Sequence, residues 1–266
     1  MPSLTLLSIS ALAALVPAAL LPYRDLSGRD TLFWLLLAVA LAGPLVWVAV
    51  QFAPGWRTGL APALWATVSL SLAVFAVTAA VSRQGWRLAT LLLPYLLLLG
   101  ILATVWQDQP GRPFSGTAPV AWIQLHIVTS VVSYAILTVA AVAGLAAFLQ
   151  DRALRSKQRG ALAGRLPSLS DCESLQVRLL AVCAVVMGLG LVTGMATQYF
   201  ETGLLLALDH KTLLALATFV VLVLLLAAYL RTGIRGRRAA RIVLLVYLLA
   251  TLGYPGVKFV TDVLIA

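Results

Sequence analysis

The sequence predicts an all-α fold, a polytopic membrane bundle with about eight transmembrane helices. Two observations lead to this prediction. Hydrophobic residues make up 62% of the 266 residues and charged residues only 11%, which is far from the composition of soluble globular proteins. The apolar residues also form runs of about 20, the length at which a helix crosses a bilayer. Backbone polar groups in hydrocarbon must be paired inside the structure, which leaves helices or closed barrels, and apolar runs of this length select helices.

Charged residues and Pro/Gly punctuation divide the chain, 1–266, into eight apolar runs of one integral membrane domain. The expected spans lie near 3–22, 32–52, 60–81, 88–106, 120–149, 176–198, 211–230 and 241–264. No Lys or Arg precedes the first run and no polar domain follows it, so we interpret it as a span rather than a cleavable signal peptide. The fifth run exceeds the bilayer thickness and should tilt or project at Gln150 and Asp151.

Small residues and proline add detail to the sixth and eighth spans. Gly190 and Gly194 form a small-xxx-small pair that permits close helix approach. Pro255 is expected to bend the eighth span. The two cysteines, Cys172 in an expected loop and Cys183 within the sixth span, indicate neither a disulfide framework nor thiol redox chemistry.

The distribution of basic residues predicts the orientation in the membrane. Fifteen of the 19 Lys and Arg residues fall on one side of the predicted spans: Arg24, Arg29, Arg83, Arg87, Arg152, Arg155, Lys157, Arg159, Arg165, Arg178, Arg231, Arg235, Arg237, Arg238 and Arg241. The positive-inside rule places these Arg-rich loops in the cytoplasm and both termini outside it. Anionic lipid headgroups are the expected partners of this charge, and nucleic acid is not expected.

The two histidines, His126 and His210, are predicted near the external ends of the fifth and seventh spans. Polar residues continue from His126 along one face of its span: Ser130, Ser133, Tyr134 and Thr138. Such a stripe should face other helices. The imidazoles are candidate ligands of a metal or of haem iron, candidate proton carriers, or interfacial hydrogen-bonding residues. As haem ligands, the pair can fill both axial positions of one haem and no more.

Two further residues are candidates for contact with a ligand at the same face. Trp122 precedes His126 by one helical turn and can stack on a porphyrin or belong to the interfacial aromatic belt. Lys258 follows Tyr247, Thr251 and Tyr254 on one face of the eighth span. It can meet an anionic group, pair with Asp262, or extend to the headgroups.

Signatures of nucleotide hydrolysis, metalloprotease and serine hydrolase chemistry do not occur in the sequence, so no catalytic residue is predicted. The spans also contain few carboxylates, which argues against a proton-coupled carrier built on intramembrane Asp or Glu.

Four segments together resemble the cytochrome c assembly protein family. They are Leu125-His126-Ile127-Val128-Thr129-Ser130-Val131-Val132-Ser133-Tyr134, Leu191-Val192-Thr193-Gly194, Asp209-His210-Lys211-Thr212 and Gly236-Arg237-Arg238-Ala239. The closest branch looks like the YpjD/HemX-type inner-membrane proteins, which are similar to the haem-handling CcsA and CcmC proteins. The resemblance covers residues 120–262 by motif and the whole chain by span count.

The resemblance implies a bacterial inner-membrane protein that binds or handles one haem at the periplasmic face during cytochrome c biogenesis. His126 and His210 are then the candidate axial ligands, with cytochrome c maturation proteins as partners. The WGxxWxWD segment of the better-known relatives is missing from the chain, so an accessory or regulator of haem supply fits better than a haem ligation enzyme. The alternative is a small-molecule permease or a membrane scaffold with structural histidines.

Overall fold

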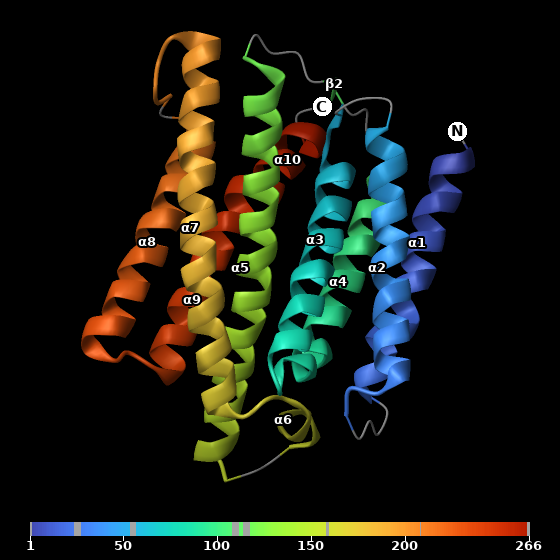
Figure 1. The fold of residues 1–266 in the computed structure, drawn as a ribbon, viewed down its shortest axis with the longest axis vertical. Coiled ribbons are helices and arrows are strands. Elements are labelled where there is room, and N and C mark those ends of the chain that lie inside the picture. The colour runs from blue at the N-terminus through green and yellow to red at the C-terminus, as the bar shows by residue number, and fades with distance from the viewer. Residues whose placement is uncertain are drawn as a thin grey trace.

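The computed structural model describes residues 2–23, 28–53, 57–107, 112–113, 118–157, 160–207 and 209–264. Within these ranges it has eight helices that are long and apolar enough to cross a membrane, which confirms the predicted all-α polytopic architecture. Figure 1 shows these helices packed side by side, with α1 beginning at the same end of the bundle at which α10 lies. This end is called the terminal end below, and the other the arginine end.

The membrane helices divide into two groups of four along the chain. The first group is α1 (Pro2–Leu20, continued by the 3-10 turn η1, Leu21–Tyr23), α2 (Thr31–Phe52), α3 (Leu60–Val81) and α4 (Ala89–Val105), which follows the 3-10 turn η2 (Gly85–Leu88). The second group is α5 (Val120–Arg155), α7 (Leu169–Thr202), α8 (His210–Thr232) and α9 (Gly236–Thr251). The short helix α6 (Ala161–Arg165) joins α5 to α7.

A two-residue antiparallel pairing joins the connection between α2 and α3 to the connection between α4 and α5 at the terminal end. The strands are β1 (Arg57–Thr58) and β2 (Arg112–Pro113), with Arg57 opposite Pro113 and Thr58 opposite Arg112. Below it, the first group packs around large aromatic residues. The rings of Trp47 and Trp65 stack with centroids 5.7 Å apart, and the Trp47 indole N–H donates to Ser8 at 2.9 Å. This bond pairs an indole that is buried away from water.

Helix α5 connects the two groups, because it packs against α3 on one side and against α7 and α9 on the other (Figure 1). Its middle part, from Val131 to Ala147, is almost entirely buried and rich in small residues, including Ala135, Ala140, Ala143 and Ala147. Helices in lipid associate through close packing, and small side chains let their backbones approach. Residues on the α5 surface are therefore well placed to contact both halves of the bundle.

The sixth span is longer than its hydropathy predicts, and the expectation that Cys172 lies in a loop is wrong. Helix α7 begins at Leu169, where Ser168 accepts a hydrogen bond from the Asp171 backbone N–H at 3.2 Å. Cys172 lies in its first turn and is fully buried. An N-cap stabilises a helix start whatever the polarity of the first turn, whereas a hydropathy window excludes a first turn that contains charged residues.

At Pro255, where the sequence predicts a bend, the structure has a π-helical turn. Helix α9 passes into η3 (Leu252–Gly256), then into α10 (Val257–Phe259) and a second π-helical turn, η4 (Val260–Leu264). Proline has no N–H to donate, so the α-helical hydrogen-bond ladder cannot run through it unchanged. Beyond the turn, the Phe259 ring packs edge-on against Trp106 at the end of α4, 5.3 Å between centroids.

Candidate functional site

His126 lies in the second turn of α5 and faces α7 at the terminal end of the bundle. Its Nδ1 atom is 2.9 Å from the backbone carbonyl oxygen of Gly190. The imidazole ring also lies against Gly194, where a Cβ atom would stand 2.8 Å from Cε1 of His126. The two glycines therefore form the surface that receives the ring, and the close approach predicted for the Gly190–Gly194 pair occurs against α5.

The Gly190 carbonyl fixes the chemical form of the imidazole. A carbonyl oxygen only accepts hydrogen bonds, so Nδ1 of His126 must be the donor. The same oxygen also accepts the Thr193 hydroxyl at 3.0 Å. In a neutral ring with its proton on Nδ1, Nε2 carries the lone pair, and this is the nitrogen that can bind a metal. Among the described residues, Nε2 has no hydrogen-bond partner.

The surroundings of His126 are open rather than closely packed. His126 is half-buried, and Trp122, one turn earlier, is 38% exposed. Leu125 and Val128 of the same turns are also exposed. The outer part of α5 thus presents an imidazole, an indole and aliphatic side chains that neighbouring helices only partly cover, which is the apolar environment that a planar hydrophobic ligand prefers.

His210 is the first residue of α8 and its side chain is exposed. Asp209 caps this helix and accepts the Thr212 backbone N–H at 2.8 Å. That hydrogen bond lowers the pKa of Asp209, and the nearby Lys211 and His210 side chains lower it further. The cap fixes where α8 begins and therefore where His210 lies.

The structure places the two histidines at one end of the bundle but in different settings. Helix α7 packs against both α5 and α8, and Figure 1 shows it between them. His126 is hydrogen-bonded to Gly190 of α7, whereas no hydrogen bond joins His210 to His126 among the described residues. Lys258 lies half-buried in α10 of the same end, and the Asp262 side chain lies outside the described residues.

The polar stripe that begins at His126 ends in a buried hydroxyl network, which confirms that this face meets other helices. The Tyr134 hydroxyl lies 2.9 Å from the Thr251 hydroxyl and 3.3 Å from that of Tyr247, both on α9. The Tyr247 hydroxyl also bonds to Tyr95 of α4. Sequence reasoning missed Tyr95. Its position in the sequence was the available signal. A tyrosine hydroxyl in the middle of a span, next to Pro94, needs a hydrogen-bond partner on another helix because lipid tails offer none.

We expect the substitution Tyr134→Phe to destabilise the bundle by about 1 kcal/mol, because it removes a buried hydroxyl and its hydrogen bonds to Thr251 and Tyr247. The measurement is the apparent melting temperature in detergent. Tyr199→Phe is the matched control, since the Tyr199 side chain is 53% exposed on α7. A Tyr134→Phe protein as stable as this control would show that the network contributes nothing to stability.

Comparison with known proteins gives two findings. A family model described as "Cytochrome C assembly protein" matches residues 56–265. A protein of Azospirillum brasilense, described as "Uncharacterized 28.8 kDa protein in nifR3-like 5'region", is 52% identical over 263 residues, which are 97% of each chain. No solved structure matches the chain. The family match includes all four segments that carry the sequence resemblance and every candidate ligand described above.

Proposed function

The chain belongs to the cytochrome c assembly protein family, and from that premise we propose that it binds and handles a single haem. Membership supports a role in cytochrome c biogenesis, and eight apolar helices support a multi-pass membrane protein. The observation that carries the haem proposal is the geometry of His126, whose Nδ1–H is held by the Gly190 carbonyl. A backbone carbonyl on one ring nitrogen is the usual way in which proteins orient an imidazole that binds metal through the other.

We propose His126 as the first axial ligand and His210 as the second. His210 is the only other imidazole in the sequence, and it opens α8 at the terminal end. Because α7 separates α5 from α8, ligation by both histidines requires the haem to extend across the outer part of α7.

Two further residues would support the porphyrin in this proposal. Trp122 is partly exposed one turn before His126 and offers an aromatic face for stacking. Lys258 is the basic residue that α10 contributes at the terminal end, and a haem propionate is a suitable anionic partner for it. Bound haem would supply the iron and the porphyrin that a cytochrome assembly pathway passes on, while this chain's part is to hold and orient it.

The location of the site follows from charge. The Arg-rich loops at the arginine end are proposed to lie in the cytoplasm by the positive-inside rule, which puts His126, His210 and both termini at the periplasmic face of the bacterial inner membrane. Without the tryptophan-rich segment of haem ligation enzymes, an accessory role beside cytochrome c maturation proteins fits best. Placement in the YpjD/HemX-type branch stays a prediction.

The test is the ultraviolet-visible spectrum and the pyridine haemochrome assay of the detergent-purified full chain, before and after reconstitution with haemin. We expect a Soret band and near-stoichiometric haem, because Nε2 of His126 offers a lone pair in an apolar setting. Absence of haem after reconstitution would contradict the proposal and favour the alternative of a permease or scaffold. Transport of a small molecule by haem-free proteoliposomes would identify the permease.

A further inference from the structure

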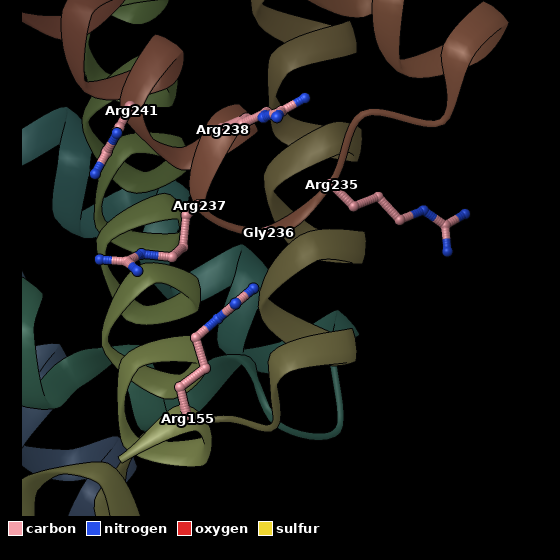
Figure 2. A pocket seen from close by; sticks show the side chains of 6 residues that line it. All are labelled: Arg155, Arg235, Gly236, Arg237, Arg238 and Arg241. Atoms are coloured by element: carbon pink, nitrogen blue, oxygen red, sulfur yellow. The ribbon is translucent and has the colours of Figure 1, made fainter.

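A cavity of about 330 Å³ opens at the arginine end, opposite His126. It is lined by Arg155, Arg235, Gly236, Arg237, Arg238 and Arg241. Figure 2 shows the Arg155 side chain extending from the end of α5 toward the segment that begins α9, with the other arginines arranged on both sides of it. Two parts of the chain that are about eighty residues apart therefore supply the basic groups of one concavity.

The cavity has an excess of positive charge. Asp151 pairs with Arg155 at 3.0 Å and lies 3.7 Å from Arg237. Glu173 of α7 accepts the backbone N–H of Gly236 at 2.7 Å, so the first N–H of α9 is already occupied. Five guanidinium groups thus face two carboxylates, which leaves three positive charges uncompensated by these neighbours. An excess of one sign in a concave site attracts small ions of the other sign.

The arginines differ in how firmly the protein holds them. Arg237 lies over the Phe148 ring at 5.2 Å and Arg235 over the Tyr229 ring at 5.6 Å. Stacking fixes a guanidinium while leaving its edge free to donate hydrogen bonds. Arg238 and Arg241 are exposed, and neither has an acidic partner among the described residues. The Nε atom of Arg237 is buried, and it has no hydrogen-bond partner among the residues that the structure describes.

We propose that this cavity is a binding site for phosphate groups, carried by an anionic lipid headgroup or by a soluble phosphate compound. The guanidinium fork matches the oxygens of a phosphate and binds them with two parallel hydrogen bonds. Setting the orientation of the chain in the membrane requires only a number of basic residues on one side. It does not require stacked arginines around a cavity from two separate segments, and this arrangement favours a ligand. The proposal does not depend on the haem site.

The experiment uses the full chain in detergent with two probes. Native mass spectrometry with equimolar phosphatidylglycerol and phosphatidylcholine tests the headgroup, and calorimetry with inorganic pyrophosphate at low ionic strength tests the soluble phosphate. The variant is Arg238→Gln/Arg241→Gln, which removes two exposed charges without an acidic partner among the described residues. The control is Arg152→Gln/Arg231→Gln, which removes the same charge from exposed arginines in the last turns of α5 and α8, outside the cavity lining.

Preferential retention of phosphatidylglycerol, or saturable pyrophosphate binding, should weaken at least about tenfold in the cavity variant and less than about twofold in the control. Loss of the lipid alone identifies the headgroup as the source, and loss of pyrophosphate binding alone identifies the soluble compound. Arg238→Lys/Arg241→Lys should restore only part of the affinity, because it keeps the charge but not the fork. Equal weakening in cavity variant and control, or no preference for either probe, would overturn the proposal.

Discussion

Substituting His126 by Ala is expected to abolish the haem Soret band of the purified protein, the largest effect that we predict. The substitution removes the lone pair of Nε2. The lost ring is the imidazole that α7 orients through the Gly190 carbonyl. Loss of an axial ligand held in this way removes both the iron bond and the geometry that makes it favourable. The measurement is haem content per polypeptide by the pyridine haemochrome assay, together with the visible spectrum.

Two companion variants separate ligation from folding. Gln124→Ala changes an exposed residue in the same part of α5 and should retain full haem content. His210→Ala should shift the Soret band and retain part of the haem, because one axial ligand remains. All three proteins should elute from a sizing column like the unsubstituted chain. A His126→Ala protein with unchanged spectrum and haem content would refute the ligand assignment, whatever happens with His210.

The sequence was sufficient for the eight spans because a bilayer imposes one strong rule, a long apolar run for each crossing. The ends of the spans were predicted less accurately than their number. Helix α7 begins after the Ser168 cap, and its first turn contains a charged residue. Hydropathy therefore placed Cys172 outside the helix. Local hydrogen bonding decides where a helix begins, and an average over about 19 residues does not resolve it.

The candidate site was predicted in pieces. His126 stood out by residue type, and Gly190 and Gly194 by spacing, yet nothing in a single sequence indicates that these three residues meet. Helical periodicity tells which residues share a face, but not which helix that face meets. Tyr95 was missed for the same reason, because its partner lies more than a hundred residues away on α9. The prediction that His126 and His210 bind one haem remains to be tested.

Replacing Gly194 by Ala should disturb the site while both proposed ligands stay in the sequence. The new Cβ would lie 2.8 Å from Cε1 and 3.1 Å from Nδ1 of His126, closer than van der Waals contact allows. Either α5 and α7 move apart or the ring leaves its hydrogen bond with Gly190. Overpacking of this kind costs about 1–3 kcal/mol. We expect a lower apparent melting temperature in detergent and at least about tenfold weaker haem binding.

Gly188→Ala is the matched control, because the same change is made two turns away on the same helix. A Cβ at Gly188 would stand 3.6 Å from Cε2 of Phe219, an ordinary contact. Alanine also favours the helix over glycine by about 0.5–1 kcal/mol, so this variant should be as stable as the unsubstituted chain or slightly more so. The helix preference acts equally in both variants, and their difference therefore reports the contact with His126. If the Gly194→Ala and Gly188→Ala proteins have the same stability and haem content, α7 does not orient the imidazole. The hydrogen bond between His126 and Gly190 would then no longer support the haem proposal.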